Sequence, residues 1–339
     1  MTERTVSSRL VVVLAAIVGV ILPLLLVELL VRGFDLDRPT PPPKSDRPRV
    51  YYFDQRKQGT TSLPRSIEKG QGVYRVAVIG DSFTFGPWMQ VDDLYSARLE
   101  RILNFNAGGR PVEVLNFGVS GFSTSQEVST LKFALKYKPD LVVLQITLND
   151  PELEPFRARD RAKRAANETT FWDGVRGYWR TLNFVDMRIK NTRSHQFFVD
   201  YHRGLFEDPR SWGRFQDAVS NFQRICREQN VPLVSFLFPM FSYRLDEQYP
   251  FTDIHKKVEA FITGLSIPFL DLSRFYRALP PDRLQVLPGV DSHPNEIAHR
   301  IAAENIYRQL VRWKVVPEEN VARVGLRARE SRPFEVATK

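Results

Sequence analysis

The residue of this chain best placed for nucleophilic chemistry is a serine that follows an apolar run. Ser82 belongs to Gly80-Asp81-Ser82-Phe83, which comes after the apolar residues 76–79 and before a helix-compatible segment. A serine at such a junction exposes its hydroxyl at a sheet edge. Its N–H points out of a helix N-terminus, where negative charge is favoured. Gly-Asp-Ser also forms ordinary turns, so the assignment depends on partners elsewhere in the chain.

Two later strand ends offer groups for the same cleft. Asn116-Phe117-Gly118-Val119-Ser120-Gly121 follows the apolar run 112–115, and a glycine there lets a backbone amide approach a ligand closely. Asn149 follows the buried, β-branched run 141–146, and its side-chain amide can donate a hydrogen bond. Each has an ordinary alternative: a glycine-rich turn for the first and an Asx-turn for the second.

A candidate base lies near the C-terminus, in Asp291-Ser292-His293-Pro294-Asn295. His293 has the chemistry of a general base, and Asp291 that of the acid that orients its ring. The same pair would also suit a metal ion. The sequence offers no third and fourth ligand at convincing spacing, so we expect no metal site.

Taken in order, the four segments resemble the SGNH (GDSL) hydrolase family, over residues 74–312. This resemblance makes Ser82 the nucleophile, His293 the base and Asp291 its partner. It builds the oxyanion hole from the N–H groups of Ser82 and Gly121 and the side-chain amide of Asn149, and it requires no cofactor. The motifs look most like the bacterial, envelope-associated branch of the family.

Two positions depart from the family pattern. Thr147 stands where the family usually has glycine, two residues before the oxyanion Asn. Asp291 lies two residues before His293, whereas the commonest family spacing is Asp-x-x-His. Neither change removes a catalytic group. The second leaves the orienting role open between Asp291 and a backbone carbonyl.

The elements that must position these residues alternate between strand and helix from Tyr74 onward. Such alternation predicts a parallel sheet with helices on both faces, and right-handed crossovers then bring the strand ends to one edge. We expect a flavodoxin-like three-layer α/β/α sandwich with a five-stranded parallel sheet. The strand candidates are 74–79, 112–116, 141–146, 233–238 and 268–272, and the helix candidates are 94–103, 125–137, 211–228, 253–264 and 295–313.

The N-terminus predicts a transmembrane anchor at residues 10–31. Residues 10–27 carry no charge, and a helix of this length spans about 30 Å, the thickness of a bilayer core. Glu28 lies near enough to the end to reach the interface. A cleaved signal peptide is the alternative, but its apolar region is usually shorter and followed by a small-x-small site. We expect an uncleaved single-pass anchor in the bilayer, with residues 1–9 cytoplasmic and the body on the extracytoplasmic (periplasmic) side.

The remaining organisation follows from composition. Residues 32–73 hold a Pro-rich spacer and the domain edge, residues 74–316 the hydrolase domain, and residues 317–339 a charged tail. The net charge of +9 is spread among acidic residues, and no nucleic-acid-binding motif is present, so we expect no nucleic-acid partner. Cys226 is the single cysteine, which excludes an intramolecular disulfide.

An insertion at 151–210 interrupts the alternation. It is rich in aromatic residues and arginines, and it leaves the sheet directly after Asn149. One interpretation is a substrate-binding lid, with Trp172 and Trp179 as candidate contacts. The other is helical packing against the core or a membrane surface.

These features predict a membrane-anchored serine hydrolase that removes acyl groups, with acetyl as one candidate, from an envelope glycan, lipid or small ester. An O-acyltransferase would use the same acyl-enzyme with a sugar hydroxyl in place of water. A non-enzymatic envelope scaffold is the third hypothesis. Retention of all four segments argues against it.

Overall fold

The computed structural model describes residues 3–36, 52–53, 59–60, 65–105, 109–153 and 180–321. The chain forms two compact units. One comprises Met1–Pro41 and Phe156–Tyr201, and the other comprises Pro42–Pro155 and His202–Lys339. The candidate contacts Trp172 and Trp179 lie outside the described residues, so their predicted role stays a prediction.

The centre of the larger unit is a five-stranded parallel sheet, which confirms the predicted fold class. Its strand order, β4-β3-β5-β6-β7, reads 2-1-3-4-5 along the chain, the flavodoxin-like arrangement. Aliphatic residues fill the central strands because both faces are covered, and every residue of β5 is buried. The strands are β3 (Tyr74–Gly80), β4 (Val112–Gly118), β5 (Leu141–Ile146), β6 (Leu233–Leu237) and β7 (Phe269–Asp271).

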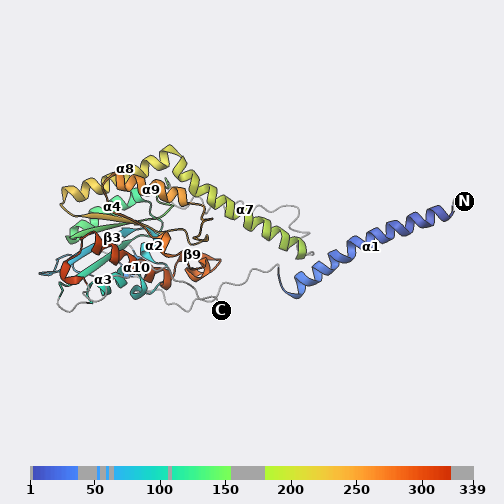
Figure 1. The fold of residues 1–339 in the computed structure, drawn as a ribbon, viewed down its shortest axis with the longest axis horizontal. Coiled ribbons are helices and arrows are strands. Elements are labelled where there is room, and N and C mark those ends of the chain that lie inside the picture. Colours follow the sequence, from blue (N-terminus) through green and yellow to red (C-terminus); the bar gives the residue numbers. More distant parts are fainter. Residues whose placement is uncertain are drawn as a thin grey trace. The chain divides into compact units, whose positions relative to one another are not determined.

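Helices cover both faces of this sheet (Figure 1). Right-handed crossovers place α4, α8 and α9 on one face and α3 and α10 on the other, and these two groups are seen on opposite sides of β3. These helices are α3 (Tyr95–Leu103), α4 (Thr124–Ala134), α8 (Pro209–Glu228), α9 (Thr252–Gly264) and α10 (Glu296–Arg312). The remaining elements are α1 (Glu3–Gly33), β1 (Tyr52–Phe53), β2 (Gly59–Thr60), the short α2 (Ser82–Phe85), α7 (Arg180–Glu207), and the hairpin of β8 (Gln285–Leu287) and β9 (Asp291–Pro294).

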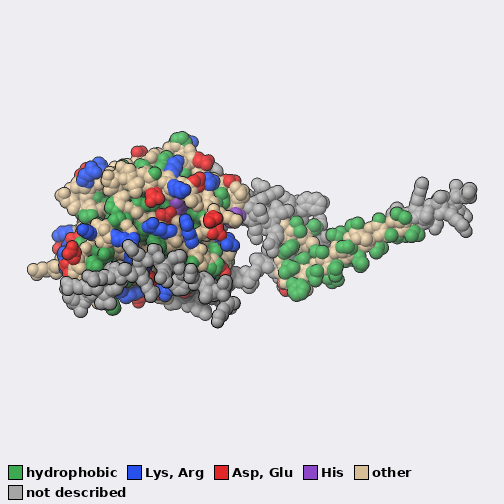
Figure 2. All heavy atoms as spheres, viewed as in Figure 1, with side chains coloured by type: hydrophobic (Ala, Val, Ile, Leu, Met, Phe, Trp, Pro, Cys, Tyr) green, Lys and Arg blue, Asp and Glu red, His purple; other side chains and the backbone are tan. Residues whose placement is uncertain are grey.

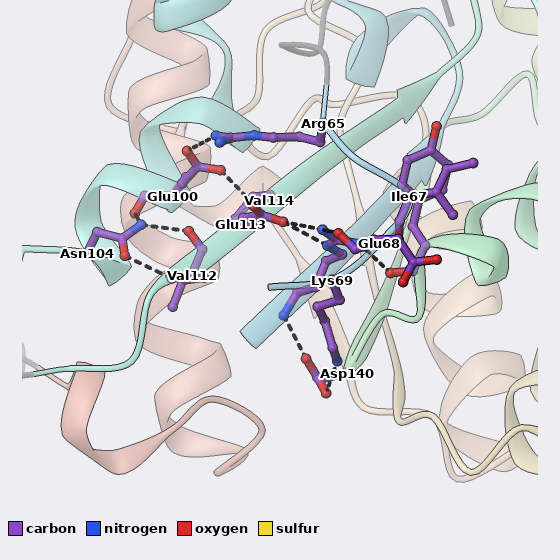
Figure 3. Close-up of polar contacts among 12 residues, drawn as sticks. Arg65, Ile67, Glu68, Lys69, Glu100, Asn104, Val112, Glu113, Val114 and Asp140 are labelled. Carbon is purple, nitrogen blue, oxygen red and sulfur yellow. Dashed lines mark hydrogen bonds and ion pairs between the residues drawn. The ribbon is translucent and has the colours of Figure 1, made fainter. Parts of the chain in front are cut away.

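A polar network fixes the ends of β3 and β4 that lie opposite the candidate site (Figure 3). The carboxylate of Glu100 on α3 accepts from the backbone N–H of Val114 at 2.7 Å and from Arg65 at 2.7 Å. The buried guanidinium of Arg75 pairs with Glu113 at 2.7 Å and donates to a main-chain carbonyl of residue 137 at 2.7 Å. These bonds satisfy polar groups that burial would otherwise leave unpaired, and they lock β4 in register with β3.

The apolar N-terminal run forms one helix, α1. Its segment Leu14–Gly33 has a mean hydropathy of 2.8 and is long enough to cross a membrane. Figure 2 shows apolar side chains along the helix, in contrast to the mixed Lys/Arg and Asp/Glu surface of the larger unit. Such a helix near an N-terminus fits a membrane anchor and a signal sequence alike.

Glu28 caps a second helix of the same unit. Its side chain is buried, and its carboxylate accepts from the backbone N–H groups of Arg180 at 3.0 Å and Thr181 at 2.7 Å. It also pairs with Arg32 at 2.7 Å. Arg180 and Thr181 open α7, where backbone donors lack helical partners and a negative charge opposes the helix dipole. The acid in the apolar run therefore has protein partners, which the sequence did not reveal.

We expect Glu28→Gln to loosen the start of α7. Loss of a charged cap costs about 1 kcal/mol, so hydrogen exchange of the Arg180 and Thr181 amides should speed up by about fivefold. Asp35→Asn is the matched control, because it removes an exposed ion pair with the Arg180 guanidinium and leaves both amides capped. Unchanged exchange in Glu28→Gln, measured on the full chain in detergent micelles, would contradict the capping role.

Candidate active site

Ser82 is placed by a sharp junction between β3 and α2. β3 ends at Gly80, Asp81 caps the helix, and Ser82 is the first residue of α2. The helix packs closely on the end of β4: a Cβ added to Gly118 would lie 2.3 Å from the backbone nitrogen of Phe85. Only glycine permits this approach, which explains its presence in the second motif. Ser82 is 9% exposed.

Asp81 stabilises the junction between β3 and α2 through hydrogen bonds to both of its carboxylate oxygens. One carboxylate oxygen accepts from the N–H of Phe83 at 2.9 Å, and the other accepts from the hydroxyl of Thr147 at 2.8 Å. Burial raises the pKa of Asp81, although these hydrogen bonds oppose the shift. Asp81 thus ties the first turn of α2 to the loop that follows β5.

His293 reaches Ser82 from the far end of the chain. Its Nε2 lies 2.9 Å from Ser82 Oγ, and its ring packs against Phe83 with the ring centroids 5.4 Å apart. Asp291 and His293 lie on β9, which pairs antiparallel with β8. Asn295 then caps α10 and donates to the carbonyl of Gln285, so the hairpin is fastened to the helix that follows it.

Asp291 completes the line of polar groups. Its Oδ1 lies 2.5 Å from His293 Nδ1 and accepts the His293 backbone N–H at 3.1 Å. Its Oδ2 accepts from the indole Nε1 of Trp88 at 3.1 Å. Burial by itself would raise the pKa of Asp291, but the hydrogen bonds from His293 and Trp88 outweigh it and lower this pKa to about 2. The carboxylate is therefore ionised at neutral pH and holds the Nδ1 proton of the imidazole.

The three candidate oxyanion groups follow adjacent strands at the same sheet edge. Ile79 of β3 pairs with Phe117 of β4 and with Leu144 of β5, so Ser82, Gly121 and Asn149 all emerge from this edge. Gly121 has φ +79, a conformation suited to glycine. Within the described ranges, the N–H groups of Ser82 and Gly121 have no hydrogen-bond acceptor, as donors awaiting a ligand would.

Thr147, the first departure from the family pattern, connects these groups. Its hydroxyl contacts both the Asp81 carboxylate and the side-chain oxygen of Asn149. Its N–H donates to Asp150 at 2.6 Å. Asp150 is buried, which raises its pKa well above the usual value, with the nearby Asp81 adding to the effect. A glycine at position 147 would lack this hydroxyl and its contacts with Asp81 and Asn149.

A second His–Asp pair has a different environment. His255 is buried on α9, with Nδ1 3.0 Å from Asp271 and Nε2 3.3 Å from the hydroxyl of Tyr249. Both ring nitrogens are therefore engaged within the protein. Among the described residues that line the adjoining cavity of about 210 Å³, no serine or cysteine is hydrogen-bonded to this ring. Sequence reasoning missed this pair because its members lie on separate elements.

The match of residues 78–301 to the GDSL-like Lipase/Acylhydrolase family decides the classification. The chain belongs to this family. It is therefore an esterase or acylhydrolase of the SGNH type, as predicted. No curated protein matches the chain.

The chain is also similar to several solved structures. The lipase/acylhydrolase from Enterococcus faecalis is 16% identical over 70% of this chain and 95% of its own, with a TM-score of 0.42. The psychrotrophic esterase EstA from Pseudoalteromonas sp. is 14% identical over 71% of this chain and 98% of its own, with a TM-score of 0.41. A catalytic mutant of an acetylxylan esterase from Geobacillus stearothermophilus is 16% identical over 70% of this chain and 94% of its own, with a TM-score of 0.40.

Proposed function

We propose that this family member cleaves acyl esters through an acyl-enzyme on Ser82. His293 Nε2 takes the hydroxyl proton as Ser82 Oγ bonds to the acyl carbon. The tetrahedral oxyanion is held by the N–H groups of Ser82 and Gly121 and by the amide of Asn149. Protonated His293 then gives its proton to the alkoxide as the ester C–O bond breaks, and the alcohol leaves. Water repeats the sequence on the acyl group, which departs as the acid.

The observation that carries the proposal is the continuous hydrogen-bonded line from Ser82 Oγ through His293 to Asp291, with separations of 2.9 Å and 2.5 Å. A nucleophile needs a base within hydrogen-bond reach and a third group that orients that base. An ionised Asp291 also stabilises the positive charge that His293 acquires in each half-reaction.

The membrane segment supports an anchored rather than a secreted enzyme. Glu28 and Val31 are buried, and the Glu28 carboxylate caps α7. Cleavage near residue 33 would remove that acceptor and leave the α7 amides unpaired. We accordingly propose that residues 10–31 remain as a single-pass anchor, with the hydrolase domain outside the cytoplasm. Its substrate would then be an acylated envelope glycan, lipid or small ester.

A matched set of esters tests the reaction. The full chain in detergent micelles would be offered p-nitrophenyl esters of increasing acyl length, with and without an oligosaccharide acceptor. We expect release of free acid that requires Ser82. Acyl transfer to the acceptor at the expense of free acid would identify a transferase that uses the same acyl-enzyme. No turnover of any ester would contradict the proposal.

Asp291→Ala should lower kcat by about 10⁴-fold, less than loss of Ser82 or His293, because the base remains but its ring is no longer oriented. Measurement of kcat and KM for this variant and the wild type, on the same series of p-nitrophenyl esters, would check the expected fall in kcat. Wild-type kcat in Asp291→Ala would show that another acceptor orients His293.

A further inference from the structure

Trp88 occupies a backbone conformation that a tryptophan rarely adopts. The N–H of Met89 donates to the carbonyl of Gly86 at 3.2 Å, which closes a four-residue turn with Pro87 at its second position. Trp88 is the third residue and has φ 67. Turns with proline second and positive φ third prefer glycine at that place, and a side chain there costs on the order of 1 kcal/mol. Backbone strain of this kind clusters at functional sites.

The turn directs the indole toward the candidate triad. Trp88 packs against the buried cluster of Met89, Leu94 and Val286, and its Nε1–H donates to Asp291 Oδ2 at 3.1 Å. The contact joins residues 203 positions apart in the chain. Packing fixes the ring, so the direction of its N–H is fixed as well.

The Trp88 N–H binds the carboxylate oxygen of Asp291 that does not contact His293. Asp291 lies two residues before His293 on the same strand, so its Oδ1 accepts both the backbone N–H and the ring of His293. Within the described ranges, Trp88 is the only partner of Oδ2. Without it, the carboxylate would be free to rotate about its terminal bond or to bind water.

We propose that Trp88 is a positioning residue of the proposed active site, which holds the Asp291 carboxylate in the plane that keeps Oδ1 on His293 Nδ1. The inference rests on the proposed function of Ser82, His293 and Asp291. An indole suits the task because it donates one hydrogen bond without adding a charge. It also covers the outer oxygen of a carboxylate whose side chain is 24% exposed.

The test separates the N–H from the ring that carries it. Trp88→Phe removes the donor and part of the packing. Replacement of Trp88 by β-(3-benzothienyl)alanine, introduced by stop-codon suppression, keeps the bicyclic shape and replaces the N–H with sulfur. In the full chain in detergent micelles, with p-nitrophenyl acetate as the probe ester, both should lower kcat by about tenfold and leave KM within about twofold.

A spectroscopic readout reports on the hydrogen bond itself. The proton between His293 Nδ1 and Asp291 should give a downfield proton resonance in histidine-labelled protein, absent from His293→Ala. In both Trp88 variants we expect this resonance to shift upfield or broaden. A purely structural role for the ring would leave it unchanged in the benzothienyl variant.

Trp212→Phe is the matched control, since Trp212 packs among Phe206, Phe215 and Phe261. It should retain wild-type kcat and the wild-type resonance. Wild-type kcat and resonance in the benzothienyl variant would overturn the inference even if Trp88→Phe fails to fold.

The activity of Ser82→Ala distinguishes failure of the Trp88 proposal from failure of the proposed function. An inactive Ser82→Ala beside fully active Trp88 variants would refute only the role of Trp88, whereas an active Ser82→Ala would refute the proposed function.

Discussion

Ser82→Ala should lower kcat for ester cleavage by about 10⁴-fold or more, with the fold intact. In the proposed mechanism the Ser82 hydroxyl is the only group of the triad that bonds to the acyl carbon, so its loss should raise the activation barrier by about 5 kcal/mol or more. The residue is small and nearly buried, and its side-chain contact in the described ranges is with His293, so alanine should fit without disturbing α2. Steady-state kinetics and thermal unfolding of the full chain in detergent micelles measure both effects.

His293→Ala should be as damaging as Ser82→Ala, and the double variant little worse than either. Residues that act as one catalytic unit are non-additive, because removal of either member already abolishes the shared step. The three variants form a double-mutant cycle on one substrate. If the two losses multiplied, Ser82 and His293 would act independently, and the proton transfer between them would be excluded.

The second large effect concerns stability in acid. His299 on α10 is fully buried, with its ring stacked on Tyr95 and its Nδ1 accepting the Tyr95 N–H at 3.2 Å. Burial lowers the pKa of His299 to about 3, and the nearby charges of Arg98 and His293 add to the effect while Glu296 opposes it. Below pH 6.5, the usual pKa of histidine, His299 is protonated in the unfolded chain but stays neutral in the folded chain. The free energy of unfolding therefore falls as the pH drops toward 3.

His299→Gln isolates this contribution, because glutamine can accept the same N–H and does not titrate. At about pH 4.5 the wild type should have lost about 3 kcal/mol relative to neutral pH through His299 alone, and the variant should not show this loss. Other buried acids affect both proteins equally, so the difference between them is the informative quantity. Unfolding free energies measured at the two pH values would give parallel changes if His299 bound its proton in the folded state.

The sheet, and the edge that carries the candidate site, were predictable because they depend on local sequence pattern. Runs such as 141–146 are apolar enough to mark buried strands, and parallel strands end together. The convergence of Ser82, Gly121 and Asn149 on one edge follows from topology alone. The helix bounds on both sides differ from expectation by a few residues, as helix ends fray.

Contacts between distant segments were not predictable. Nothing in the sequence around Trp88 indicates that its indole meets Asp291, and the β8–β9 hairpin is too short to produce a recognisable alternation. Glu28 was interpreted as reaching the membrane interface, and nothing in the sequence indicated that it also caps α7. In each case a tertiary contact decides the role of a residue whose local sequence favours another interpretation.

The most direct measurement of the central claim is covalent labelling of the full chain with a fluorophosphonate, followed by peptide mass spectrometry. We expect one phosphonylated residue, Ser82, in the wild type, and loss of labelling in both Ser82→Ala and His293→Ala, because the hydroxyl reacts only while His293 accepts its proton. A label on another residue, or equal labelling of Ser82 without His293, would contradict the central claim.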